Sequence, residues 1–162
     1  MTDQQPLITI GRAEEVIFPE YGASASPARV DTGAKTSAIW ASNIVEKDRT
    51  LHFVLFDSLS PFYTGKLLTS RDYSVRTVTS STGHGEDRYA VKLIVVIGGK
   101  KIKATFTLAD RSTQVYPILI GRNVLRGKFI VDVKRGKPFI EQEHVRLQRL
   151  RQRLLKRKGN KQ

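Results

Sequence analysis

Ala28-Arg29-Val30-Asp31-Thr32-Gly33-Ala34 is the stretch of this sequence that decides the fold. The apolar residues up to Val30 predict a β-strand, and Asp31-Thr32-Gly33 predicts a tight polar loop directly after it. Gly33 permits close backbone approach, so the Asp31 carboxylate can stand at the mouth of a β-fold as an acid or a base. A bare Asp-Thr-Gly is more often an Asx turn that simply ends a strand, and the tripeptide alone leaves both interpretations open.

Most of the sequence on either side of this stretch also predicts strands. The clearest hairpin spans residues 91–108, where apolar residues alternate on both sides of a turn at residues 98–101. The apolar run Pro117–Ile120 predicts a buried strand, and one or two helical turns are expected over Arg122–Arg126. Shorter strands are expected at residues 7–10, 16–18, 51–56, 74–79 and 129–133, and at Phe139-Ile140. The pattern indicates an all-β domain with one short internal helix.

In the last part of the chain the apolar residues recur at a different spacing, and the net charge is strongly positive. Leu147, Leu150 and Leu154 recur at helical spacing among Arg and Lys, which predicts a basic amphipathic helix over residues 144–157. Residues 134–162 hold 11 Lys and Arg against two Glu, so this tail carries +9 of the net charge of +13. We therefore expect a domain at residues 1–142 and a basic helical tail at residues 143–162. Such a tail suits RNA, an acidic protein or an anionic surface, and charge does not choose among them.

The amino-acid composition limits the classes of protein to which this chain can belong. A chain of 162 residues with 40% hydrophobic and 27% charged residues fits one globular domain. Without cysteine it has no disulfides, thiolate nucleophile or Cys-type zinc site. No apolar run is long enough to span a membrane, and the first residues lack the pattern of a secretory signal. These features predict a cytoplasmic protein without a membrane span.

A second segment, Ile118-Leu119-Ile120-Gly121-Arg122-Asn123-Val124-Leu125, changes the interpretation of Asp31-Thr32-Gly33. The two segments together resemble the signature segments of retropepsin-like aspartic peptidases. The resemblance implies a closed acid-protease barrel or sandwich, in which the Gly of the second segment packs beneath the Asp-Thr-Gly loop. Residues 28–38, 80–84 and 125–132 are similar to a bacterial branch that carries the label ATP-dependent zinc protease. That branch is often associated with an ATP-grasp ligase that adds glutamates to a ribosomal protein.

The residues themselves do not support the zinc and ATP in that label. The chain offers only His52, His84 and His144 as imidazole ligands, with no closely spaced pair. It also lacks the glycine-rich phosphate-binding motifs of nucleotide sites. We expect no cofactor and no metal site.

The implied chemistry requires two carboxylates that share one proton. This chain has one Asp-Thr-Gly, and no other Asp is followed by Thr-Gly or Ser-Gly. The resemblance therefore implies a homodimer whose site is assembled from two Asp31 residues across a twofold axis. Asp31, Thr32 and Gly33 are the predicted catalytic residues.

The segment Thr77–Arg88 occupies the place of the retropepsin flap, which folds over the substrate, and its glycines supply flexibility. His84 either hydrogen-bonds substrate or faces solvent without a role. Lys35 stands where viral members carry an acid that pairs with the Arg of the second segment, here Arg122. Two cations near the cleft predict a preference for acidic substrates such as glutamate-rich tails. The predicted substrate-binding residues are Ala34, Lys35, Ser80, Ser81, Thr82, Gly83, His84 and Arg122.

Two hypotheses from different classes follow. The first is a homodimeric aspartic endopeptidase that acts on a protein or peptide. The second is a catalytically silent domain of the same fold that binds RNA, a ribosomal protein or an ATP-grasp glutamate ligase through its basic tail. The intact Asp-Thr-Gly favours the enzyme, whereas Lys35 and the tail favour the binding module.

Overall fold

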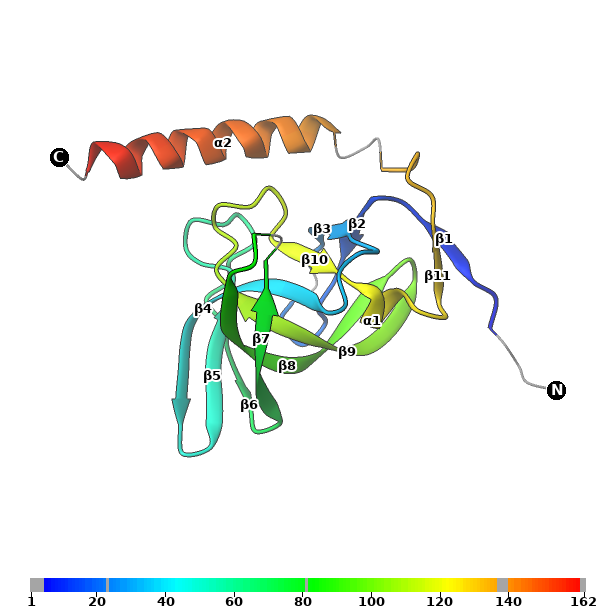
Figure 1. The fold of residues 1–162 in the computed structure, drawn as a ribbon, viewed down its shortest axis with the longest axis horizontal. Coiled ribbons are helices and arrows are strands. Elements are labelled where there is room, and N and C mark those ends of the chain that lie inside the picture. Colours follow the sequence, from blue (N-terminus) through cyan, green and yellow to red (C-terminus); the bar gives the residue numbers. More distant parts are fainter. Residues whose placement is uncertain (1–4, 23, 81, 137–139, 161–162) are drawn as a thin grey trace.

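The structure of the protein is a computed structural model that describes residues 5–160 except 23, 81 and 137–139. It consists mainly of strands, which confirms the predicted all-β class (Figure 1). The strands are β1 (Ile8–Ile10), β2 (Ala13–Val16), β3 (Ser26–Val30), β4 (Ser37–Lys47), β5 (Thr50–Leu55), β6 (Leu67–Ser70), β7 (Tyr73–Thr79), β8 (Gly85–Ile97), β9 (Lys100–Ala109), β10 (Ile118–Ile120) and β11 (Phe129–Val131). The helices are α1 (Arg122–Leu125) and α2 (Ile140–Gly159).

Strand β10 brings the two signature segments of the sequence together. It lies between β3, to which it is parallel, and β4, to which it is antiparallel. The register with β3 pairs Ile120 with Val30, so the two strands end at the same level. The loop after β3 and the start of α1 therefore leave the sheet side by side, although they lie about ninety residues apart in the sequence.

The main sheet has nine strands, and its longest path is β2-β3-β10-β4-β9-β8-β7. Strands β5 and β6 extend from β4, and β1 pairs with β11 in a separate two-stranded sheet. In the described residues the path stays open at β7, so the structure lacks the fully closed barrel that the resemblance implies. A single bridge between Ile17 and Val96 joins the chain after β2 to β8, which shows how far the sheet curls round.

The long hairpin of β8 and β9 forms as the alternation predicts, with a shorter turn. Gly98 and Gly99 make the whole connection, with φ of 55° and 77°. Two consecutive positive φ values are typical of the tight turn that matches strand twist, and glycine adopts them without steric cost.

The core lies inside the curled sheet. Its largest fully buried side chains include Phe53, Phe56 and Phe106, together with Ile39 of β4 and Ile118 of β10. Burial of such apolar surface is the main free-energy term that favours the folded state. It holds β3, β4 and β10 rigidly beneath the loops that they carry.

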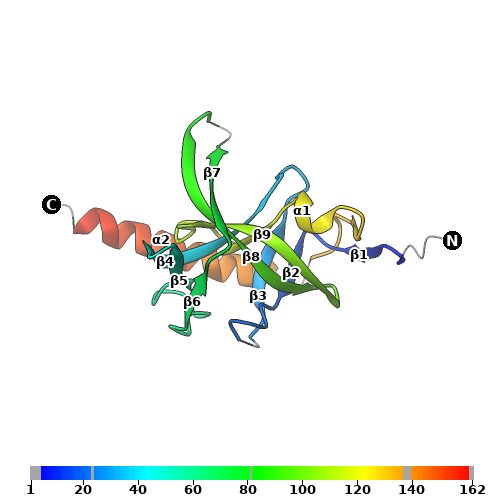
Figure 2. The same cartoon turned by 90° about the horizontal axis from the view of Figure 1, so that it is seen from below.

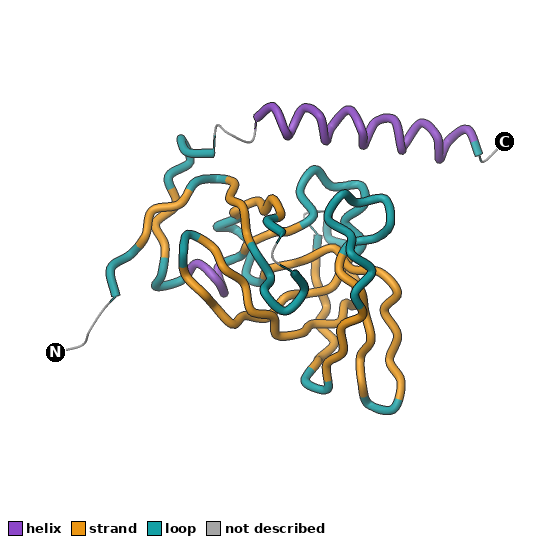
Figure 3. The backbone as a smooth tube through the Cα atoms, turned by 180° about the vertical axis from the view of Figure 1, so that it is seen from behind, coloured by secondary structure: helices purple, strands orange, loops and turns teal. Residues whose placement is uncertain are grey.

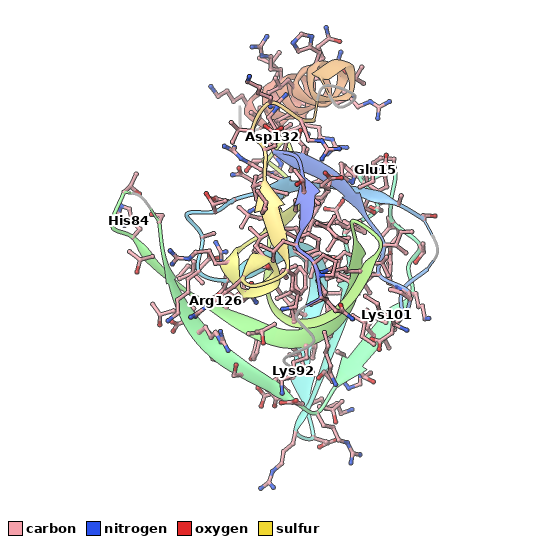
Figure 4. All side chains as sticks on the ribbon, turned by 90° about the vertical axis from the view of Figure 1, so that its right-hand side faces the viewer. Glu15, His84, Lys92, Lys101, Arg126 and Asp132 are labelled. Atoms are coloured by element: carbon pink, nitrogen blue, oxygen red, sulfur yellow. The ribbon has the colours of Figure 1, made fainter. Side chains whose placement is uncertain are left out.

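Two segments project from the same side of the molecule. The hairpin of β7 and β8 stands away from the body, and the loop between β3 and β4 points in the same direction beside α1 (Figure 2). His84 lies at the tip of the hairpin (Figure 4). The hairpin and the loop that carries Asp31 are therefore on the same side of the domain.

Helix α2 lies across one end of the strand body, over loops rather than over a sheet face (Figures 1 and 3). It contains the predicted helix 144–157 and begins earlier, so Ile140 is helical rather than part of a short strand; Phe139 lies outside the described residues. None of its described side chains is buried. Neither helix in the described part of the chain is long and apolar enough to cross a membrane.

Candidate active site

Asp31 stands at the end of β3, as predicted. Its backbone N–H donates to the carbonyl of Ile120 at 2.9 Å, which ties it to the end of β10. Its carboxylate oxygen Oδ1 accepts the backbone N–H of Gly33 at 3.0 Å, so the loop is an Asx-type turn that fixes the side chain. Asp31 is half-buried, and Thr32 and Gly33 are exposed. The loop presents one carboxylate, with its geometry set by the backbone, to the outside of the domain.

Gly121 supports this loop from beneath. A Cβ at this position would lie 2.8 Å from the carbonyl carbon and oxygen of Thr36 and 2.9 Å from the carbonyl oxygen of Ala34. The next residue, Arg122, donates its backbone N–H to the Ala34 carbonyl at 2.8 Å. A side chain larger than hydrogen would separate these contacts, so glycine is required by close packing of two backbones.

Ser37 and Asn123 lock the same contact, and the sequence analysis did not single out either residue. Ser37 is fully buried, and its hydroxyl donates to Asn123 Oδ1 at 2.8 Å while accepting the N–H of Gly121 at 2.9 Å. Asn123 Oδ1 also accepts the Ser37 N–H at 3.0 Å, and its Nδ2 donates to the Thr105 carbonyl at 2.8 Å. A network of this kind, anchored on the buried Ser37 and Gly121, rigidifies the segment that holds it. The only sequence signal was a polar Ser directly before the apolar residues 38–41.

A cavity of about 480 Å³ opens beside the Asp31 carboxylate. Its walls include Thr32, Tyr116 and two arginines, Arg12 and Arg29, and α2 contributes Leu147. The predicted cations Lys35 and Arg122 do not line it; both are exposed on the loop and on α1. In the described residues no carboxylate forms an ion pair with Arg122.

The tip of the β7–β8 hairpin is shaped by its own hydrogen bonds. The N–H of Ser80 donates to the His84 carbonyl at 2.9 Å, and the N–H of Gly83 donates to the Ser80 carbonyl at 3.0 Å. The hydroxyls of Ser80 and Thr82 are 2.8 Å apart. Gly83 has a φ of 83°, which explains glycine at that position. The described tip residues are exposed, and Ser81, also predicted to bind substrate, lies outside the described residues.

Four other aspartates that follow strands or turns each have a bonding partner away from Asp31. Three of them accept a backbone N–H two residues later in the chain, and the fourth pairs with Lys92 at 3.0 Å. They are Asp57, Asp110, Asp132 and Asp72. None lines the Asp31 cavity, so no second carboxylate for a dyad comes from the described part of one chain.

The histidines do not assemble a zinc site. His52 lies on β5, His84 lies at the hairpin tip and His144 lies on α2. The described residues contain no group of three His, Asp or Glu side chains that could hold a metal ion. Four-coordinate zinc needs at least three such protein ligands, so these residues do not fit the metal.

The fold, with the Asp31 loop resting on the end of β10 and the start of α1, is of the retropepsin-like class. The family model described as "Retropepsin-like aspartic endopeptidase RimB" matches residues 9–144, which covers the strands, α1 and the Asp31 loop. The chain belongs to this RimB-like family.

The curated relatives carry a different kind of name. A "probable alpha-L-glutamate ligase" of Shewanella pealeana is 34% identical over 127 residues, which cover 76% of this chain and 28% of that protein. The protein of the same name from Shewanella halifaxensis is 32% identical over 145 residues, 87% of this chain and 32% of its own length. The chain thus spans about a third of the length of these relatives.

A solved structure has the same fold. A Legionella pneumophila protein of unknown function superposes with a TM-score of 0.51 at 22% identity, over 78% of this chain and 94% of that one.

Proposed function

We propose that this protein is an aspartic endopeptidase that works as a homodimer with one Asp31 from each copy. The observation that carries the proposal is the lone Asp31 carboxylate, held by the Gly33 N–H at the end of β3 beside a cavity. No other described acid faces that cavity, so the second carboxylate has to come from a second copy of the chain.

In this mechanism the two Asp31 side chains share one proton. One carboxylate removes a proton from a water molecule that attacks the scissile carbonyl carbon, and the protonated partner donates to the carbonyl oxygen. Thr32, exposed beside Asp31, would buttress the two loops through hydroxyl hydrogen bonds across the twofold axis. In each copy, the Ser37–Asn123 network fixes the position of the Asp31 loop, because this loop packs on β10 and α1 of the same chain.

The substrate is a protein or peptide, and we propose that acidic segments are preferred. The exposed Lys35 and Arg122 and the two arginines of the cavity place positive charge around Asp31. The hairpin tip, with Ser80, Ser81, Thr82, Gly83 and His84, would close over the bound peptide. We assign this activity to residues 1–142 and place it in the cytoplasm, with residues 143–162 as a separate tail.

One observation favours a second candidate, a silent module that binds RNA, a ribosomal protein or an ATP-grasp ligase. Several basic residues of α2 are exposed, Arg149, Arg151 and Lys156 among them, and no described side chain of this helix is buried. The relatives named as glutamate ligases contain this domain as about a third of their length. A loosely packed basic helix could therefore join the domain to such a partner.

Asp31→Asn tests the enzyme directly. The variant should lose cleavage of a Glu-rich peptide library while keeping its fold, because the amide cannot act as a base. Asp57→Asn is the matched control, since Asp57 accepts the Leu59 N–H at 2.7 Å in the same kind of turn but lies away from the cavity. Sedimentation should show a dimer. Full cleavage by Asp31→Asn, or an active monomer, would refute the proposal.

Truncation after residue 142 separates the two candidates. If the domain is the enzyme, the truncated chain still cleaves peptides. If the protein is a binding module, truncation removes partner binding, whereas Asp31→Asn leaves that binding intact.

A further inference from the structure

A residue of α2, Leu147, lines the same cavity as Asp31. The lining of this cavity of about 480 Å³ includes Asp31 and Thr32 at the end of β3, Val133 after β11 and Leu147. Val133 is exposed and Leu147 is half-buried, so both present apolar surface to the cavity. Figure 4 shows α2 above Asp132, at the end of the molecule toward which the β7–β8 hairpin rises. The C-terminal helix thus borders the space beside the proposed catalytic acid.

A second copy of the chain must enter this space if two Asp31 side chains are to share a proton. The sharing needs carboxylate oxygens within about 3 Å of each other, so the two Asp31 loops have to be in direct contact. Thr32 is exposed next to Asp31, so the surface that would meet the second loop is uncovered on this side. Protein interiors are close-packed, and a helix at the border of the cavity competes with the second copy for the same volume.

The helix rests on the domain without packing tightly against it. Its least exposed described residues are Leu147, Leu150 and Arg153, which recur every three residues on one face and are each only half-buried. Arg153 donates from Nη2 to the Leu59 carbonyl. Leu150 and Arg153 also line a cavity of about 520 Å³ at this contact. Two cavities at one contact leave side-chain atoms without neighbours and forfeit dispersion energy. The helix can therefore leave the domain at a small cost in free energy.

We propose that α2 is an autoinhibitory element that holds the chain as an inactive monomer and leaves the domain when a second copy binds. The inference rests on the proposed function, because the site is complete only when two Asp31 loops meet. Pairing requires a released helix in both copies, so the apparent affinity falls by the released fraction once for each copy. A released fraction of about one third to one tenth weakens pairing by roughly 10- to 100-fold.

Full-length Leu147→Asp and Leu150→Asp proteins test the inference by sedimentation equilibrium. A carboxylate at either position loses water against apolar side chains when the helix docks, so each variant favours the released helix. Each should dimerise roughly 10- to 100-fold more tightly than the wild-type chain, up to the limit set by the docked fraction. Damage to the fold would weaken association instead, so tighter pairing is a result that a merely structural role of α2 does not produce.

Leu155→Asp is the matched control. It adds the same charge to the same helix, at a residue that is 68% exposed and lines neither cavity. An equal gain in this control would mean that net charge alone governs pairing and would overturn the inference. Unchanged pairing in Leu147→Asp and Leu150→Asp would also overturn it, and so would weaker pairing, which would mean that α2 supports the dimer.

The two proposals fail separately in this experiment. Tighter dimers of Leu147→Asp that cleave no peptide refute only proteolysis. A wild-type dimer that cleaves peptides, with the same dimer dissociation constant as Leu147→Asp and Leu150→Asp, refutes only autoinhibition. Chains that stay monomeric at every concentration, with or without these substitutions, refute both.

Discussion

Gly121→Ala is the sharpest test of how the Asp31 loop is held. The backbone at Gly121 is extended, with φ of −96° and ψ of −176°, so alanine meets no conformational penalty there. The whole effect comes from the added methyl group, which would stand 2.8 Å from the Thr36 carbonyl and 2.9 Å from the Ala34 oxygen. Both neighbours are backbone atoms and cannot rotate away, so the loop and α1 must move apart by several tenths of an ångström.

Overpacking of this kind costs about 1–3 kcal/mol. For a chain of this size that loss should lower the Tm by roughly 2–10 °C, measured by thermal unfolding followed by circular dichroism. Peptide cleavage should fall further than stability does, because the displaced loop carries Asp31 and misplacement by about 1 Å can cost on the order of 100-fold in rate. Gly22→Ala is the control, since no atom lies within 4 Å of its Cβ. A Gly121→Ala protein with the wild-type Tm would show that the close contact beneath the loop is absent in solution.

Two further predictions concern the surroundings of the site. Ser37→Ala should destabilise the fold by about 1–3 kcal/mol in denaturant unfolding, because Asn123 Oδ1 and the Gly121 N–H lose a buried partner; a change below about 0.5 kcal/mol would contradict the network. Hydrogen bonding from Ser112, whose backbone N–H donates to Asp110 Oδ1 at 2.9 Å, holds the pKa of Asp110 below its ordinary value of 3.8. The folded state therefore gains stability from this group above about pH 4 and loses it as the pH falls through the lowered pKa. Asp110→Asn should flatten the stability profile in that acidic range, and an unchanged profile would count against the bond.

The sequence was sufficient to predict the central part of the fold. Strand β10 and helix α1 were expected from the apolar run before Gly121 and the polar residues after it, and the register of Ile120 with Val30 places them beside the Asp31 loop. The hairpin of β8 and β9 was expected from its alternation. The hairpin depends only on the local alternation of apolar residues. The position of β10 and α1 depends on two motifs that specifically pack against each other.

Strand β4 was missed for a physical reason. Its first half is buried on both faces, and its second half projects from the body with a bulge between Ser42 and Val45. The sequence over Ser37–Lys47 therefore has neither the alternation of a half-exposed strand nor a clean apolar run.

The electrostatics of the site could not be predicted for a different reason. Arg12 and Arg29 are seventeen residues apart in the sequence, and both line the cavity beside Asp31 because β2 pairs with β3. Lys35 and Arg122 are exposed and lie outside the lining of this cavity, so their role toward a substrate stays a prediction.

The intrinsic fluorescence of Trp40 can report whether the tail is attached to the domain. It is the single tryptophan of the chain, it is 5% exposed, and its ring meets Phe56 edge-on at 6.4 Å. It also lines a cavity of about 520 Å³ whose lining includes Val145, Arg149 and Leu150 of α2. If the helix leaves the domain, water reaches the indole. The emission wavelength and the quenching of Trp40 fluorescence therefore measure the attachment of the tail without an added label.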